Sequence, residues 1–121
     1  MRAVVLVDHG SREARANAQL EEIAALLRER LRETPVLTAH MELAEPTIAA
    51  AVETCVRQGA SEIIVVPYFL ALGRHAARDI PRLVETAAAS HPDLVIRVSE
   101  PLGVHPKLVD VILDRVDEAS S

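Results

Sequence analysis

The sequence predicts an α/β fold: a single open, mainly parallel four-stranded sheet with helices on both faces, of the flavodoxin-like kind. Two observations lead to this fold class. Four short apolar runs alternate with four longer segments whose apolar residues recur at helical spacing. Strands that alternate with helices imply right-handed crossovers and a parallel sheet. No linker, low-complexity segment or repeat divides the chain, so we expect one domain over residues 1–121.

The first strand and helix are predicted at residues 2–7 and at about residues 11–33. The strand is a continuous, β-branched run, as expected when both faces of a parallel sheet are covered. Ser11 is the predicted N-cap of the helix, and Pro35 ends it. The apolar stripe of this helix consists of Leu20, Ile23, Ala24, Leu27 and Leu31.

The second strand and helix follow over residues 36–41 and about 46–58. Pro46 suits the first helical position, because an N–H group there would have no partner within the helix. Gly59 fits the position just after a helix, where the left-handed backbone conformation is common. Residues 62–69 then form the third predicted strand, centred on four consecutive β-branched residues.

The last two predicted helices flank the fourth strand. The third helix covers about residues 79–90, residues 91–93 form a turn, and the strand covers residues 94–98. The final helix runs over about residues 106–118, and its apolar stripe is expected to be buried. That stripe consists of Leu108, Val109, Ile112, Leu113 and Val116.

Composition and charge narrow the class of function. The net charge of −5 and the scattered arginines give no concentrated basic face, so we expect no nucleic-acid partner. The apolar runs fall far short of the roughly 20 residues that span a bilayer, so we expect no membrane segment. The single cysteine and the absence of a signal-peptide pattern at the first residues favour a cytosolic location.

Polar residues follow three of the predicted strands, at the point where each strand ends. They lie at residues 8–12, 42–46 and 73–75. Because ligands of open parallel sheets bind outside the carboxyl ends of the strands, we expect these residues at one rim of the fold. Two imidazoles, of His9 and His75, together with a carboxylate suit a divalent transition metal.

The roles of several residues near this rim can be interpreted in more than one way. Glu42 and Glu45 both precede the second helix, so one can face the site while the other interacts with the helix N-terminus, which suits Glu45. Asp8 either orients His9 or only accepts hydrogen bonds from backbone amides. His40 shares a face of its strand with Glu42, and that face is either open or covered by a helix.

Taken together, these motifs resemble the sirohydrochlorin chelatases. Four segments carry the resemblance in order along nearly the whole chain: Asp-His-Gly-Ser-Arg at 8–12, Glu-Leu-Ala-Glu-Pro at 42–46, Pro-Tyr-Phe-Leu at 67–70, and residues 73–81. The short, single-domain CbiX type is the most similar in length. The resemblance implies a single chelatase half-domain over residues 1–121. It also implies an ATP-independent lyase that inserts Co(II), or in relatives Ni(II) or Fe(II), into a tetrapyrrole for cobalamin or sirohaem.

The resemblance also implies roles for particular residues. His9 and His75 carry over as metal ligands and catalytic groups, and Glu42 is the first choice for the acidic catalytic residue. Sirohydrochlorin carries many carboxylates, which helix N-terminal amides and guanidinium groups bind well. The residues expected to contact the substrate are Ser11, Arg12, Arg74 and Phe69.

Other classes of function have less support. The sequence contains no phosphate-binding loop of the GxxxxGK[ST] type, so neither ATP nor an organic cofactor is expected. The rival interpretation is a non-catalytic metal or tetrapyrrole carrier that uses the same histidines without turnover. A large planar ligand needs two walls and 121 residues build only a shallow one, which favours a homodimer.

Overall fold

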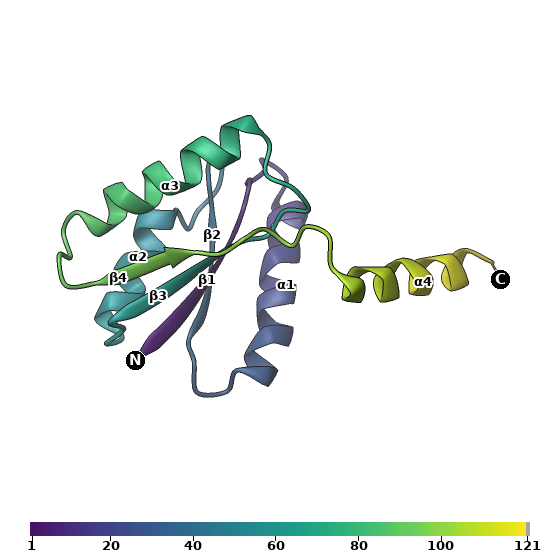
Figure 1. The fold of residues 1–121 in the computed structure, drawn as a ribbon, viewed down its shortest axis with the longest axis horizontal. Helices are drawn as coiled ribbons and strands as arrows, with labels where there is room; N and C mark the ends of the chain where they lie inside the picture. Colours follow the sequence, from purple (N-terminus) through teal and green to yellow (C-terminus); the bar gives the residue numbers. More distant parts are fainter. Residues whose placement is uncertain (121) are drawn as a thin grey trace.

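A computed structural model describes residues 1–120 (Figure 1). The strands are β1 (Arg2–Asp8), β2 (Val36–His40), β3 (Glu62–Pro67) and β4 (Val95–Val98). The helices are α1 (Ala14–Arg30), α2 (Ile48–Arg57), α3 (Arg74–Ala88) and α4 (Pro106–Ser120). The strands form one sheet in the order β2-β1-β3-β4, and every neighbouring pair is parallel. The predicted α/β class with an open parallel sheet is therefore confirmed.

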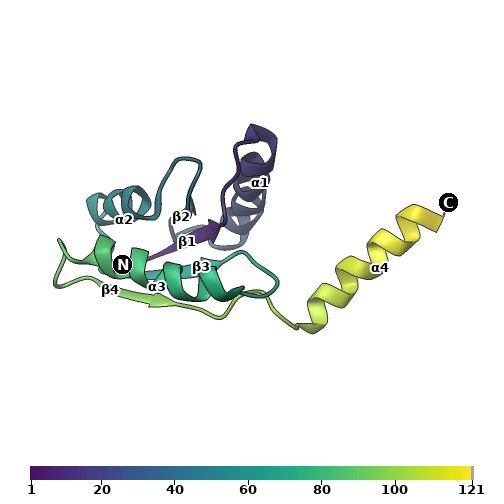
Figure 2. The same ribbon diagram turned by 90° about the horizontal axis from the view of Figure 1, so that it is seen from above.

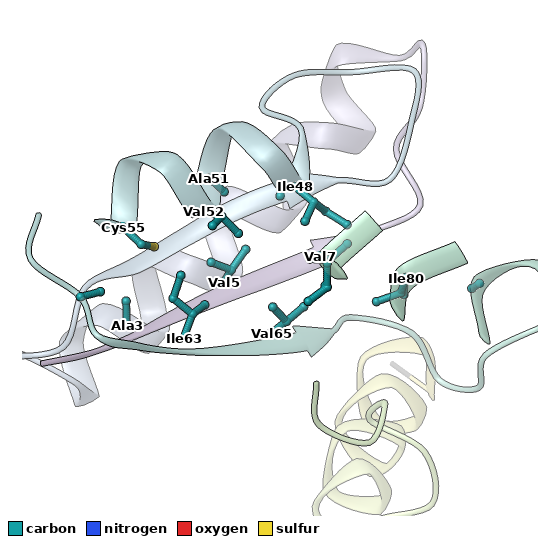
Figure 3. Packing of buried hydrophobic residues seen from close by; sticks show 14 residues of the cluster. Ala3, Val5, Val7, Ile48, Ala51, Val52, Cys55, Ile63, Val65 and Ile80 are labelled. Carbon is teal, nitrogen blue, oxygen red and sulfur yellow. The ribbon is translucent and has the colours of Figure 1, made fainter. Parts of the chain in front are cut away.

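The helices cover the two faces of the sheet unequally. Val4 and Leu6 of β1 point to one face and pack with Leu20 of α1. The alternate residues of β1 point to the other face, where α2 and α3 pack together. Figure 3 shows this second core, in which Val52 of α2 and Ile80 of α3 lie over the β1 and β3 side chains. Packing on both faces thus supports the sheet behind the rim formed by its strand ends.

The first two helices begin later than predicted. The N-cap of α1 is Glu13 rather than Ser11, so the prediction for Ser11 was wrong. The N-cap of α2 is Thr47, whose hydroxyl accepts a hydrogen bond of 3.1 Å from the Ala50 N–H. Pro46 therefore precedes this helix and does not begin it. A capping hydroxyl satisfies an N–H group that the helix leaves unpaired, and this fixes the start of α2.

Helix α3 begins five residues earlier than predicted, at Arg74 instead of Asp79. Gly73 is its N-cap, and the Gly73 carbonyl accepts from the Ala77 N–H at 3.0 Å. Pro81 then lies inside the helix, where it removes one backbone donor. The buried stripe nevertheless continues on one face through Ala76, Ile80 and Val84, and such packing is the main source of helix stability in proteins. β3 also ends two residues early, at Pro67.

The predicted burial of the last helix was wrong. No residue of α4 is buried, and the side chain of Ile112 remains 60 % exposed. Figures 1 and 2 show α4 extending away from the sheet beyond the end of β4. Helical periodicity predicts an apolar face but does not say what covers it. Within residues 1–120, no helix is long and apolar enough to cross a bilayer.

Candidate functional site

The ends of β1 and β2 bring His9 and Glu42 together. His9 follows the last residue of β1, and Glu42 lies two residues beyond the end of β2. The His9 Nε2 atom is 3.3 Å from the Glu42 Oε1 atom, and the two side chains are 56 % and 58 % exposed. An imidazole beside a carboxylate, both open to solvent, can bind a metal ion and accept protons.

A tight turn at Gly10 makes this approach possible. The Glu42 N–H donates to the His9 carbonyl at 3.2 Å, so β1 and β2 remain paired beyond their assigned ends. Gly10 has a φ of +93°, and a Cβ atom there would lie 1.9 Å from the Glu42 carbonyl oxygen. Only glycine suits such a backbone conformation in so narrow a space.

The loop between β1 and α1 is held by Asn17, which the sequence interpretation missed. The Ser11 N–H donates to Asn17 Oδ1 at 2.9 Å, and Asn17 Nδ2 donates to the Ser11 carbonyl at 2.7 Å. The Ser11 hydroxyl accepts from the Glu13 N–H at 3.0 Å. Because Asn17 fixes the backbone of Ser11, it also fixes the turn that carries His9. An asparagine one turn into a helix is the only sequence signal for this role.

His75 lies in the first turn of α3 rather than in a loop. Its Nδ1 atom accepts a hydrogen bond of 3.2 Å from Nη2 of Arg78, one turn further along the helix. Arg78 in turn contacts the carboxylate of Asp79 at 3.4 Å. Because a neutral imidazole that accepts at Nδ1 carries its proton on Nε2, the contact with Arg78 must be released before His75 can bind a metal ion.

The residues predicted to bind substrate are spread along the same rim. Ser11 and Phe69 line a hollow of about 280 Å³ beside His9. Arg12 and Arg74 are exposed, the first between β1 and α1 and the second at the start of α3. A second hollow of about 270 Å³ adjoins Glu42 and is lined by Met41, Asp79, Arg82 and Leu83.

The described part of the chain contains no group of three or more His, Cys, Asp or Glu side chains placed to hold a metal ion. His9 and Glu42 are paired, whereas His75 lies on α3 with Arg78. The His9–Glu42 pair is open to solvent. It differs from a closed four-ligand site of the kind that holds structural zinc.

Two residues with shifted pKa values lie away from this rim. The hydrogen bond from Arg28 is the main cause of a lowered pKa of Glu21 on α1. Burial raises the pKa of the Cys55 thiol on α2, so this group stays protonated and unreactive. Neither residue belongs to the candidate site.

Comparison with known proteins places this fold in a family. A model of the CbiX family matches residues 3–119 of the chain. The chain belongs to the CbiX family. This CbiX chain is 42 % identical over 118 residues to the chloroplastic sirohydrochlorin ferrochelatase of Arabidopsis thaliana, with coverage of 98 % of the chain and 52 % of that protein. It therefore spans about half the length of the Arabidopsis relative.

Two further relatives match the CbiX chain over nearly their whole length, and a third matches it over about half of its own. The sirohydrochlorin cobaltochelatase of Methanocaldococcus jannaschii is 37 % identical over 139 aligned positions, covering 95 % of this chain and 97 % of that one. A crystal structure of a CbiX protein from Marinobacter aquaeolei VT8 superposes with a TM-score of 0.85 at 37 % identity, covering 98 % and 97 %. SirB from Bacillus subtilis with Fe3+ gives a TM-score of 0.88 at 31 % identity, covering 99 % of this chain and 48 % of SirB.

Proposed function

We propose that this chain is an ATP-independent sirohydrochlorin chelatase, a lyase that inserts a divalent metal into the tetrapyrrole for cobalamin-type or sirohaem-type cofactors. The observation that carries the proposal is the exposed His9–Glu42 pair at the carboxyl ends of β1 and β2. It supports the proposal because it offers a metal ligand and a proton acceptor at one point of the rim. The names of the relatives from Arabidopsis and Methanocaldococcus point to the same substrate.

Metal insertion has a simple balance of atoms. The ring loses two N–H protons and gains one divalent ion on its four nitrogen atoms. His9 and His75 are proposed to hold the ion through imidazole nitrogens, which bind borderline metals well. Glu42, and the imidazoles once they have released the ion, are proposed to accept the departing protons, because carboxylates and imidazoles act as general bases.

An incomplete ligand set favours transfer over storage. A closed site with four side-chain ligands keeps its metal as a structural element. Here the exposed His9 and Glu42 leave coordination positions open for the ring nitrogens. An ion held by these exposed side chains would stay accessible to the ring nitrogens, as insertion by a chelatase requires.

The exposed cations of the rim suit the carboxylates at the ring edge. Arg12 and Arg74 flank the candidate site from the loop before α1 and from the start of α3. Guanidinium groups bind carboxylates through paired hydrogen bonds. Phe69 and Ser11 line the hollow beside His9, where the face of the ring is proposed to rest.

The choice of metal has less support than the choice of reaction. Imidazole and carboxylate ligands accept Co(II), Ni(II) and Fe(II) alike, so selectivity comes from geometry and supply. We take Co(II) as the first choice, because two relatives covered over 97 % of their length are sirohydrochlorin cobaltochelatases.

We also propose that the active form is a homodimer in which α4 packs on a second copy of the chain. The face of the sheet that carries α1 is only half covered, because α1 packs on β1 and β2. In register, Ile64 and Val66 of β3 share that face with Val4 and Leu6, and neither is fully buried. Val95 on the neighbouring β4 is exposed as well.

Helix α4 carries an apolar face that is likewise left uncovered among residues 1–120. Its apolar residues Val109, Ile112 and Val116 recur at helical spacing and are all exposed. It leaves the sheet directly after β4, so it does not cover its own β3 and β4 (Figure 2). A two-fold pair in which each α4 covers the other copy's open half-face would satisfy both surfaces with one symmetric contact.

An anaerobic absorbance assay tests the chelatase against the carrier. Sirohydrochlorin and Co(II) are mixed with and without the protein, and the reaction is repeated with Ni(II) and Fe(II). A chelatase accelerates insertion at protein concentrations far below that of the ring. A carrier binds ring or metal at one equivalent but leaves the spontaneous rate unchanged with all three metals.

A further inference from the structure

A buried histidine and a partly buried aspartate form a hydrogen-bonded pair directly behind the candidate site. Asp8 and His40 are the last residues of β1 and β2, and they are direct partners in the register of the two strands. The His40 Nδ1–H donates to Asp8 Oδ1 at 2.5 Å. His40 is only 4 % exposed, and among residues 1–120 it is the only polar or charged side chain that is buried.

This pair is linked to the site on both strands. His9 follows Asp8, and the Met41 N–H donates to the Asp8 carbonyl at 3.0 Å, next to the hydrogen bond that joins Glu42 to His9. His40 also lies close to the turn itself, because a Cβ atom on Gly10 would lie 3.1 Å from the His40 Cβ. The Asp8–His40 contact is therefore the last side-chain link between the strands before His9 and Glu42.

Stability alone does not explain such a pair. Two apolar side chains of similar volume would pack at this position without the cost of removing an imidazole and a carboxylate from water. A directional hydrogen bond, by contrast, holds both side chains in one arrangement. A short bond between the strand ends thus sets the spacing of the residues that follow them.

We infer that Asp8 and His40 are positioning residues whose hydrogen bond holds His9 at the distance from Glu42 that metal binding requires. The inference rests on the proposed function, since it assigns His9 and Glu42 to the metal. His40 itself is not a metal ligand in this account, because its side chain is buried behind the site.

The test compares two substitutions of His40. His40→Leu keeps the approximate volume and removes the hydrogen bond, whereas His40→Asn places an amide N–H close to the position of Nδ1. The His9 ring signals are followed by ¹⁵N NMR, assigned through their loss in His9→Ala, and the Kd for Co(II) is measured by titration without the ring. We expect His40→Leu to shift the His9 signals and weaken Co(II) binding by about tenfold, and His40→Asn to restore both.

A second histidine–carboxylate pair supplies the matched control. His91 Nε2 lies 2.8 Å from Glu53 Oε2, in the turn that precedes β4 and so at the opposite end of the sheet from the rim. His91→Leu should leave the His9 signals and the Kd for Co(II) unchanged. A purely structural role for His40 would make His40→Leu behave as His91→Leu does, and that result would overturn the inference.

Two further results keep the test decisive. If His40→Leu does not fold, Asp8→Ala removes the acceptor of the hydrogen bond from the other strand, and unchanged His9 signals in that variant would equally overturn the inference. A wild-type protein that binds no Co(II) would contradict the proposed function. The metal-free His9 signals would still decide whether the Asp8–His40 bond positions His9.

Discussion

The imidazole of His9 lies 3.3 Å from the carboxylate of Glu42, although the two residues follow different strands. The backbone explains the approach, because the Glu42 N–H donates to the His9 carbonyl and the Gly10 turn leaves room for Glu42. The His9–Glu42 pair is thus a property of the β1–β2 rim.

Replacing Glu42 by Gln tests the acidic residue of the pair. The amide can neither accept a proton nor balance the metal charge, so we expect the rate of Co(II) insertion to fall by about 100-fold. Glu45→Gln is the matched control, since Glu45 is also exposed and lies in the same loop. Initial rates by anaerobic absorbance check the prediction, and equal losses in the two variants would refute it.

The Gly10 turn gives a prediction about stability. Gly10→Ala adds a Cβ atom 1.9 Å from the Glu42 carbonyl oxygen, whereas Gly59→Ala at a similar φ of +95° meets nothing within 4 Å. Gly59→Ala should cost about 1 kcal/mol of unfolding free energy for its backbone conformation. Gly10→Ala should cost about 1–3 kcal/mol more because of the clash. Urea denaturation midpoints measure both, and similar midpoints would count against the described turn.

The dimer proposal predicts a mass change on one substitution. Ile112→Asp places a charge on the exposed apolar face of α4 and should convert the dimer to a monomer with its sheet intact. Leu26→Asp changes an equally exposed leucine on α1 and should leave the dimer unchanged. Sedimentation equilibrium distinguishes the two species. A wild-type monomer at high protein concentration would rule the proposal out.

The lowered pKa of Glu21 predicts that the stability of the protein depends on pH. Its carboxylate accepts from Arg28 at 2.6 Å and from Thr38 at 3.2 Å, and the Arg28 hydrogen bond is the main cause of its lowered pKa. A pKa lowered on folding stabilises the protein above the usual glutamate pKa, and this contribution is lost as the pH falls through the folded-state value.

Glu21→Gln should therefore lower the free energy of unfolding at neutral pH and make no difference in acid. The pair is exposed, so the loss at neutral pH should stay below about 1 kcal/mol. Thermal unfolding at several pH values, with the exposed Glu22→Gln as the control, measures this difference. A difference that grows as the pH falls would contradict the assignment.

Much of the fold was predictable because its signals are local. The continuous apolar runs of β1 and β3 indicate strands covered on both faces, and their alternation with helices fixes the parallel sheet. The first residues of the helices were harder to predict from the sequence. Ser11 and Thr47 are both good caps by residue type, but only Thr47 acts as one. The pairing that satisfies Ser11 comes from Asn17, a tertiary contact.

The difference between local signals and tertiary contacts also explains the results for α4 and for the site. The periodicity of Ile112 and Val116 correctly predicts an amphipathic helix, but burial depends on a partner surface that the pattern does not encode. The sequence placed His9 and Glu42 at one rim from strand ends alone. It left open whether Asp8 serves His9, and the structure instead pairs Asp8 with the buried His40.

Kinetics of His75→Ala test the central claim most directly. Insertion of Co(II) into sirohydrochlorin is followed by anaerobic absorbance, and binding of the metal-free ring is measured separately. The account predicts that His75→Ala loses insertion while ring binding is retained, and that His91→Ala, altered at the opposite end of the sheet, matches the wild type. Insertion by His75→Ala at the wild-type rate would contradict the assignment of the rim as the site of metal insertion.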